Sequence, residues 1–154
     1  MRMRRRICKG CYEIWRHIRT SGMAEIYVGV DSQSKEWVVV KIPRMDKLPR
    51  SMDRLREESE KLRALDHKNI VRWRDECEEN GAFYLVEELV RGGRMMEMYE
   101  RTRPSISETL RLMRELIEAV QYLHRRTPFP IVHGDIKPMN IIISCLLYTS
   151  PSPR

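Results

Sequence analysis

The most informative segment of the chain is His133-Gly134-Asp135-Ile136-Lys137-Pro138-Met139-Asn140, which lies between the apolar runs 130–132 and 141–143. It places a carboxylate (Asp135), a cation (Lys137) and a carboxamide (Asn140) close together in the chain. Phosphoryl transfer needs a carboxylate to orient a hydroxyl, a cation to meet developing phosphate charge, and a neutral oxygen ligand for Mg²⁺. The alternative is a polar turn between two apolar strands, so the rest of the chain must decide.

This octapeptide resembles the catalytic loop of the eukaryotic-type protein kinases, whose pattern is H-R-D-x-x-x-x-N. Lys137 followed by Pro138 resembles the serine/threonine-directed version. The resemblance implies that Asp135 orients the substrate hydroxyl and accepts its proton, that Lys137 steadies the transferred phosphoryl group, and that Asn140 holds Mg²⁺. Gly134 replaces the arginine that commonly reads a phosphorylated activation loop, which counts against control by that route.

A lysine inside a β-branched run, residues 36–42, is the next feature that fits this resemblance. The run resembles the kinase V-A-I-K strand, with Val39 in place of alanine and Lys41 as the phosphate-contacting lysine. Residues 51–66 form a helical pattern, and Glu58 falls on its leucine stripe. An inward-facing glutamate needs a cation, so we expect Glu58 to pair with Lys41, as in active kinases. The alternatives are an edge-strand lysine and a glutamate that reaches water.

The segment 18–28 reads as strand, turn and strand, in the position of the kinase glycine-rich loop. Only Gly22 is a glycine; Arg19, Ser21 and Ala24 stand at the three usual glycine positions, so an ordinary hairpin turn remains open. Residues 85–93 resemble the kinase hinge, where the C=O of Glu88 and the N–H of Val90 would face adenine. The resemblance implies nucleotide contacts by Ile18, Ser21, Gly22, Ile26, Val39, Lys41, Glu58, Glu88 and Val90.

Two residues near the hinge depart from the family pattern. Glu87 stands at the gatekeeper position, where burying a carboxylate costs free energy without a partner. Arg94 stands where many relatives have an acidic ribose contact. Both departures count against ordinary ATP affinity, and a plain strand ending in a Gly-Gly turn is the alternative interpretation of the hinge segment.

The distribution of charges and cysteines limits which other binding, metal or membrane roles the chain can have. The chain has 154 residues and a net charge of +7, with four arginines in its first six residues (Arg2, Arg4, Arg5 and Arg6). This run predicts a solvated basic tail; the alternative is a nucleic-acid contact, which we do not expect. Cys8 and Cys11 form a lone C-x-x-C, so we expect reduced thiols rather than a zinc or redox site. No apolar run reaches membrane-spanning length, which makes a cytoplasmic or nuclear protein the default.

Local sequence patterns predict the remaining strands, turn and helix. Strands are expected at 70–75 and 82–89 around a turn at 76–81 that ends in Asn80-Gly81, a strong hairpin signal. A capping box at 105–108 opens a long amphipathic helix. Its expected core residues are Leu110, Met113, Leu116, Ile117, Val120 and Leu123. Residues 145–154 resemble a translated sequencing adapter, with a natural Ser/Pro-rich tail as the alternative.

The predicted fold class is α+β: a kinase-like small lobe of antiparallel sheet plus one helix, followed by the start of a mostly helical large lobe. The expected parts are a basic tail (1–11), the small lobe and hinge (12–90), an incomplete large lobe (91–144) and the adapter-like end (145–154). The resemblance implies transfer of phosphate from Mg-ATP to Ser or Thr of a protein substrate. The alternative is a pseudokinase, a scaffold or nucleotide-binding module without catalysis. The chain contains no Asp-Phe-Gly, so we expect these 154 residues to be inactive alone.

Overall fold

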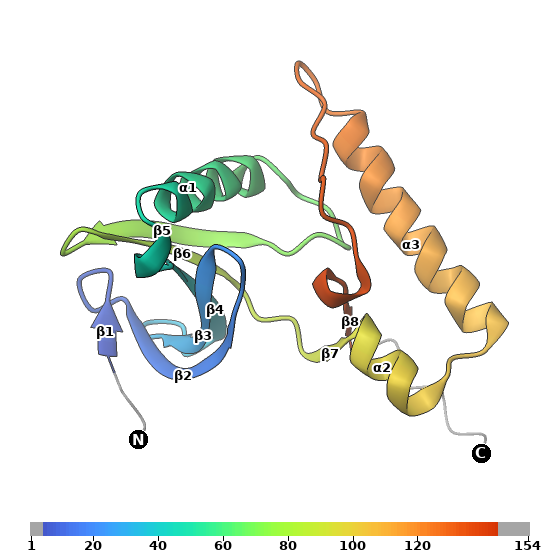
Figure 1. Ribbon diagram of the computed structural model, residues 1–154, viewed down its shortest axis with the longest axis horizontal. Coiled ribbons are helices and arrows are strands. Elements are labelled where there is room, and N and C mark those ends of the chain that lie inside the picture. The colour runs from blue at the N-terminus through green and yellow to red at the C-terminus, as the bar shows by residue number, and fades with distance from the viewer. Residues whose placement is uncertain (1–4, 145–154) are drawn as a thin grey trace. The chain divides into compact units, whose positions relative to one another are not determined.

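A computed structural model describes residues 5–144, which divide into two compact units (Figure 1). Unit 1 comprises residues 5–66 and 71–89, and unit 2 comprises residues 67–70 and 90–144. Leu89 is therefore the last residue of unit 1, close to the boundary after residue 90 that the sequence predicts. The adapter-like segment 145–154 lies outside the described residues.

Unit 1 is built on one antiparallel sheet, whose strand order is β1-β2-β3-β4-β6-β5. The strands are β1 (Arg5–Ile7), β2 (Tyr12–Thr20), β3 (Ala24–Asp31), β4 (Trp37–Pro43), β5 (Trp73–Glu79) and β6 (Ala82–Glu88). The β5–β6 hairpin is confirmed, but β5 starts three residues later than predicted and continues through Glu79. The turn is short because Asn80 and Gly81 both adopt positive φ, which closes a hairpin with two residues.

The two faces of this sheet bury different residues. On one face, Val38 and Val40 of β4 pack with Tyr84 and Val86 of β6. On the other face, Leu55 of α1 (Arg50–Arg63) packs against residues of β3 and β6 (Ala24, Phe83 and Leu85). The alternation of buried and half-buried residues from Val38 to Lys41 follows from the strand period of two and leaves Val39 and Lys41 on the α1 side. Lys41 is thus placed by the same pattern that builds the core.

The N-terminal segment differs from the expected basic tail. Arg5–Ile7 forms strand β1, which pairs with β2, and Ile7 is fully buried. Cys8 and Cys77 form a disulfide that joins the end of β1 to β5, the two outer strands of the sheet. The expectation of reduced thiols is therefore wrong for these two cysteines, because the curled sheet brings together positions 69 residues apart. Cys11 is free and exposed.

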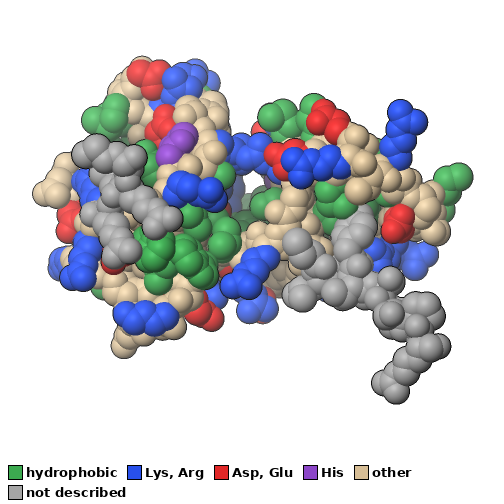
Figure 2. Space-filling view, turned by 90° about the horizontal axis from the view of Figure 1, so that it is seen from below, with side chains coloured by type: hydrophobic (Ala, Val, Ile, Leu, Met, Phe, Trp, Pro, Cys, Tyr) green, Lys and Arg blue, Asp and Glu red, His purple; other side chains and the backbone are tan. Residues whose placement is uncertain are grey.

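On the face drawn in Figure 2, the basic residues are spread out rather than gathered. Figure 2 shows Lys and Arg side chains distributed over the visible surface, with Asp and Glu side chains among them. Several pair locally, including Arg44 with Asp46 and Arg56 with Glu78. Residues 1–4, which hold part of the arginine run, lie outside the described residues.

Unit 2 contains β7 (Gly92–Arg94), α2 (Met95–Thr102), α3 (Ile106–His124), a short 3-10 turn η2 (Pro138–Asn140) and β8 (Ile142–Ser144). Strands β7 and β8 pair antiparallel, and Ile143 packs with Met95 and Leu112. The predicted capping box is confirmed: Ser105 and Glu108 exchange hydrogen bonds at the start of α3. No helix among residues 5–144 is long and apolar enough to cross a membrane.

The buried face of α3 is only partly the predicted one. Leu123 is buried as expected, but Leu110 and Ile117 are exposed, whereas Leu112 and Ala119 are buried. The periodicity correctly predicted a helix, but a broad apolar surface has more than one side that can be covered. Within unit 2, α2 and β8 cover the side that carries Leu112.

Candidate active site

Lys41 on β4 lies between two carboxylates of unit 1. Its Nζ is 2.6 Å from Glu58 Oε1 on α1, so the predicted ion pair is present. The same Nζ is 2.7 Å from Glu87 Oε1 on β6. Glu87 was recognised from the sequence as a carboxylate that needs a partner, but its partner was not identified; Lys41 fills that role.

Burial and the neighbouring opposite charges act against each other on the pKa values of Lys41 and Glu87. Burial alone would lower the pKa of Lys41, but the charges of Glu87 and Glu58 outweigh it and hold that pKa above its ordinary value. Burial raises the pKa of Glu87, and the positive charge of Lys41 acts in the opposite direction. Lys41 therefore carries its positive charge at neutral pH, which a phosphate-binding lysine requires.

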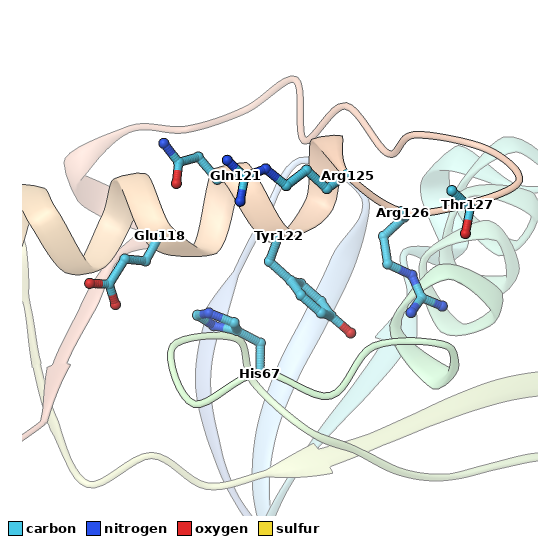
Figure 3. Close-up of a pocket in the computed structure, with 7 residues that line it drawn as sticks. All are labelled: His67, Glu118, Gln121, Tyr122, Arg125, Arg126 and Thr127. Atoms are coloured by element: carbon cyan, nitrogen blue, oxygen red, sulfur yellow. The ribbon is translucent and has the colours of Figure 1, made fainter.

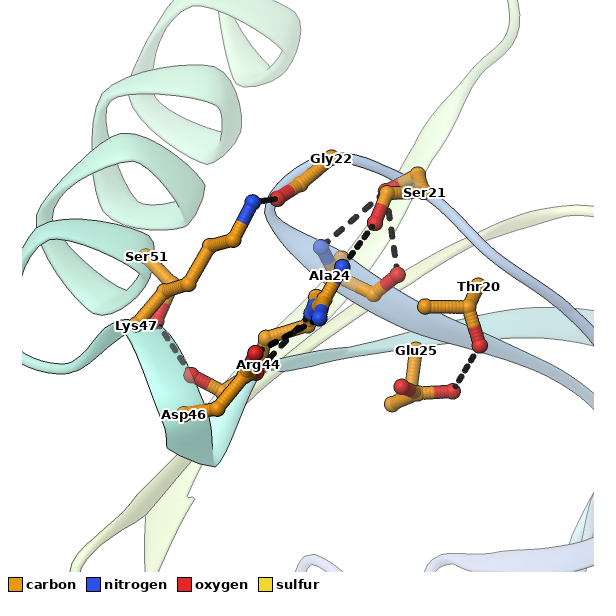
Figure 4. Close-up of polar contacts among 9 residues, drawn as sticks. All are labelled: Thr20, Ser21, Gly22, Ala24, Glu25, Arg44, Asp46, Lys47 and Ser51. Carbon is orange, nitrogen blue, oxygen red and sulfur yellow. Dashed lines mark hydrogen bonds and ion pairs between the residues drawn. The ribbon is translucent and has the colours of Figure 1, made fainter.

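The expected phosphate loop is a tight turn between β2 and β3 (Figure 4). The Ser21 N–H donates to Ala24 O at 2.8 Å, and the Ala24 N–H donates to Ser21 Oγ at 3.0 Å. Lys47 Nζ donates to Gly22 O at 2.9 Å, and Arg44 donates to Ser21 O at 3.4 Å. Two amides at the expected glycine positions are thus engaged within the turn, as in an ordinary hairpin.

The predicted nucleotide-contacting residues of the sheet follow its register. Ile26 pairs with Lys41 across β3 and β4, and Val39 pairs with Glu87 across β4 and β6. Ile26 is buried, whereas Ile18 at the end of β2 is exposed. Glu88 ends β6, where its backbone N–H donates to Arg72 O at 3.0 Å and its carboxylate accepts from the Arg72 N–H at 2.8 Å. Val90 belongs to unit 2.

The stretch from His133 to Asn140 is an exposed loop of unit 2 that is held by short-range bonds. Lys137 Nζ is 2.8 Å from Asp135 Oδ1. Asn140 Nδ2 donates to Asp135 Oδ2 at 2.8 Å and to Asp135 O at 3.0 Å. The hydrogen bond from Lys137, followed by that from Asn140, holds the pKa of Asp135 below its ordinary value. The three predicted catalytic side chains therefore form one constellation around an ionised carboxylate.

Gly134 gives this loop its shape. Its φ is +76°, in the left-handed region that glycine enters at little cost and other residues avoid. The imidazole of His133 accepts a hydrogen bond from the Asp135 N–H at 3.2 Å, so the residues on both sides of Gly134 are linked. An arginine at position 134 would be strained in this conformation.

A separate open pocket of about 480 Å³ lies on unit 2 (Figure 3). It is lined by His67 and by residues at the end of α3, including Tyr122, Arg125 and Arg126. The His67 and Tyr122 rings lie 5.0 Å apart, and the Arg126 guanidinium lies over the Tyr122 ring. None of the predicted catalytic or nucleotide-binding residues lines it. His67 Nδ1 also accepts a hydrogen bond from the Asn69 N–H at 3.1 Å.

Comparison with known proteins identifies the family. The protein kinase domain family matches residues 12–146. The chain belongs to the protein kinase domain family. It is 36% identical over 137 residues to the serine/threonine-protein kinase PrkC of Bacillus subtilis (strain 168), covering 87% of this chain and 21% of that protein. It is 29% identical over 142 residues to CBL-interacting protein kinase 16 of Oryza sativa subsp. japonica, covering 90% and 30% respectively.

A solved kinase structure has the same fold. The crystal structure of Rad53 residues 1–466 in complex with AMP-PNP superposes with a TM-score of 0.77 at 27% identity. The match covers 88% of this chain and 36% of that one. The predicted kinase-like fold class is therefore confirmed. The chain spans about a fifth to a third of the length of these proteins.

Within the kinase fold, the structure brings the predicted site residues together as two groups. The first comprises Lys41 and Glu58, to which the structure adds Glu87 as a direct partner. The second comprises Asp135, Lys137 and Asn140. The sequence carried one usable signal for Glu87: it directly follows the apolar run of residues 82–86.

Proposed function

We propose that the protein to which this chain belongs transfers the γ-phosphoryl group of ATP to serine or threonine hydroxyls of protein substrates. The observation that carries the proposal is the constellation in unit 2, where Asp135 holds Lys137 at 2.8 Å and Asn140 at 2.8 Å. A carboxylate, a cation and a carboxamide in contact supply the groups that phosphoryl transfer needs. The similarity to serine/threonine kinases and the Lys137-Pro138 sequence support a Ser/Thr acceptor.

The residues fit Mg-ATP in their donor chemistry. Lys41 offers a charged ammonium group to phosphate oxygens, and Glu58 fixes its position. Both hydrogen bonds from the Asn140 side chain to Asp135 use the amide nitrogen, so they leave the carboxamide oxygen for a hard cation. Magnesium, when bound, would neutralise charge on the β- and γ-phosphates. The AMP-PNP complex of the structurally similar kinase supports a nucleotide ligand.

The roles of the loop residues follow from their contacts. The ionised carboxylate of Asp135 would orient the attacking hydroxyl and accept its proton. Lys137, already beside that carboxylate, would meet the negative charge of the transferred group. Asn140 would hold the metal while its amide group keeps Asp135 oriented. Positioning and electrostatic stabilisation supply most of the rate enhancement in this class of reaction.

A second candidate function is a pseudokinase, a scaffold or nucleotide-binding module with the kinase fold. Two observations favour it. The amides of Ser21 and Ala24 are used within the hairpin turn, which reduces the donors available to phosphates. The carboxylate of Glu87 beside Lys41 adds a negative charge near the place where phosphates would bind.

The test uses a protein that includes the remainder of the kinase domain, because these 154 residues contain no Asp-Phe-Gly and are expected to be inactive alone. Asp135→Asn should lower phosphate transfer to a serine-containing peptide by roughly 10²- to 10⁴-fold, the usual contribution of a general base. The matched control, Glu97→Gln at an exposed position of α2, should leave the rate unchanged. Equal rates for Asp135→Asn and wild type reject the enzyme; nucleotide binding without transfer by the wild type favours the pseudokinase.

A further inference from the structure

Lys41 is shared by two carboxylates that differ in accessibility. The Glu58 side chain is 47% exposed, whereas that of Glu87 is 4% exposed. The Lys41 side chain is 17% exposed, so it lies mostly within the protein. Water can replace an exposed partner of a lysine, but it cannot easily replace a buried one. The two contacts are therefore not equivalent, although their lengths are nearly the same.

The two carboxylates also come from different kinds of element. Glu58 lies on α1, a helix that packs on the sheet through side chains such as Leu55 but shares no backbone ladder with it. Glu87 lies on β6, which is hydrogen-bonded to the strand of Lys41, with Val39 opposite Glu87 and Lys41 opposite Leu85. A shift of α1 would change the distance to Glu58. The distance from Lys41 to Glu87 is fixed by the sheet. Leu85 and Val86, which precede Glu87 on β6, are fully buried.

Glu87 in turn depends on Lys41. A buried carboxylate needs a nearby cation, because burial disfavours its charged form. Lys41 is its direct ion-pair partner, and Arg19 of β2 adds a more distant positive charge. In the sheet register, Arg19 lies opposite Ile26, which lies opposite Lys41. Arg19 and Lys41 therefore both favour the charged form of the Glu87 carboxylate.

We propose that Glu87 is a second, fixed anchor for Lys41, which holds the ammonium group in place when Glu58 is withdrawn. The proposal rests on the proposed function only for the meaning of Lys41 as the phosphate-contacting residue. It deepens that function by assigning Glu87 as a positioning residue. In this protein, a displacement of α1 breaks one ion pair but does not release the lysine.

The test measures how readily Lys41 is acylated in the 154-residue chain. An amine reacts with acetyl N-hydroxysuccinimide only when it is unprotonated, and at about pH 8.5 roughly 1% of an ordinary lysine is in that form. Mass spectrometry of the Lys41 peptide gives its rate relative to exposed lysines of the same digest. The variants are Glu87→Gln and Glu58→Gln, with Glu57→Gln as the matched control on the exposed side of α1.

Removal of the buried charge should have the larger effect. We expect Glu87→Gln to raise the Lys41 acylation rate at least about 10-fold, equivalent to one pKa unit. Glu58→Gln should raise it by less than about 3-fold, because water screens an exposed pair. Glu57→Gln should leave it unchanged. An unchanged rate in Glu87→Gln, or an effect of Glu58→Gln as large as that of Glu87→Gln, overturns the proposal.

Two further experiments distinguish a failure of the variant to fold, a failure of the anchor and a failure of the proposed function. If Glu87→Gln does not fold, as judged by circular dichroism, thermal unfolding of Lys41→Met is compared with that of Lys41→Met/Glu87→Met. The double variant should be the more stable, since it leaves no unpaired buried carboxylate; equal or lower stability overturns the anchor. In the protein that includes the remainder of the kinase domain, Mg-ATP should slow wild-type acylation of Lys41. If it does not, while the variants behave as expected, the proposed function fails and the anchor stands.

Discussion

Lys41 and Lys137 both lie within 3 Å of a carboxylate, yet they belong to different kinds of site. Lys41 contacts carboxylates that are 17 and 46 residues away in sequence and lies mostly buried on a sheet. Lys137 contacts a carboxylate two residues away, and both side chains are at least half exposed. The first contact depends on the folding of unit 1, whereas the second forms within a single loop. Ion pairs of nearly equal length at Lys41 and Lys137 therefore contribute different amounts to the free energy of folding.

The largest expected difference is between Lys41→Met and Lys137→Met. Lys41→Met leaves Glu87 buried without its direct partner, which should lower the free energy of unfolding by about 3–5 kcal/mol. Lys137→Met removes an exposed ion pair and should change it by less than about 1 kcal/mol. Urea unfolding of both variants, monitored by circular dichroism, makes the comparison. Similar losses for the two lysines would show that burial does not distinguish the two sites.

The contacts that could be predicted from sequence are those with a periodic or local signal. The Lys41–Glu58 ion pair follows from a β-branched strand and from the position of a glutamate relative to helix leucines. The Asp135–Lys137–Asn140 constellation follows from a short motif whose members are close in the chain. The capping box and the Asn80-Gly81 turn are local in the same sense. Family resemblance added the order of these features along the chain.

The contacts that sequence could not predict depend on how the sheet curls. Cys8 and Cys77 are joined because β1 and β5, at opposite ends of the strand order, approach each other. Glu87 meets Lys41 because β6 pairs with β4, a register that no local pattern specifies. Ile7 is a single apolar residue after an arginine run, so its full burial left no periodic signal. Long-range pairing, rather than weak local propensity, accounts for these differences.

Loss of the disulfide should have the next largest effect. Cys8–Cys77 links positions 69 residues apart, and Cys77→Ser should lower the free energy of unfolding by about 2–4 kcal/mol, because a long loop gains entropy in the unfolded chain. The matched control is Cys11→Ser, which changes the free, exposed cysteine and should be near neutral. Denaturant unfolding with and without reductant provides the measurement. If reductant destabilises Cys77→Ser as much as wild type, the disulfide is not the cause.

The capping box of unit 2 should contribute less and should depend on pH. Ser105→Ala removes a cap hydrogen bond to the Glu108 N–H and should cost about 1 kcal/mol of helix stability. The Ser105 N–H, followed by its hydroxyl, holds the pKa of Glu108 below its ordinary value of 4.5. This contribution is therefore present above that pH and is lost as the pH falls through the lowered pKa. Helicity at 222 nm during acid titration tests it; a titration of Glu108→Gln, which cannot ionise, identical to that of wild type would contradict the cap.

The smallest effect should arise from the backbone of the exposed loop. Gly134 has a φ of +76°, and Gly134→Ala should cost roughly 0.5–1 kcal/mol of local stability because alanine resists that conformation. Gly22→Ala is the matched control: Gly22 has no positive φ, and an added Cβ would meet nothing within 4 Å. Hydrogen exchange of the amides of residues 135–140 should quicken in Gly134→Ala alone. Equal exchange in both variants would mean that side-chain bonds to Asp135, rather than the glycine backbone, set the loop conformation.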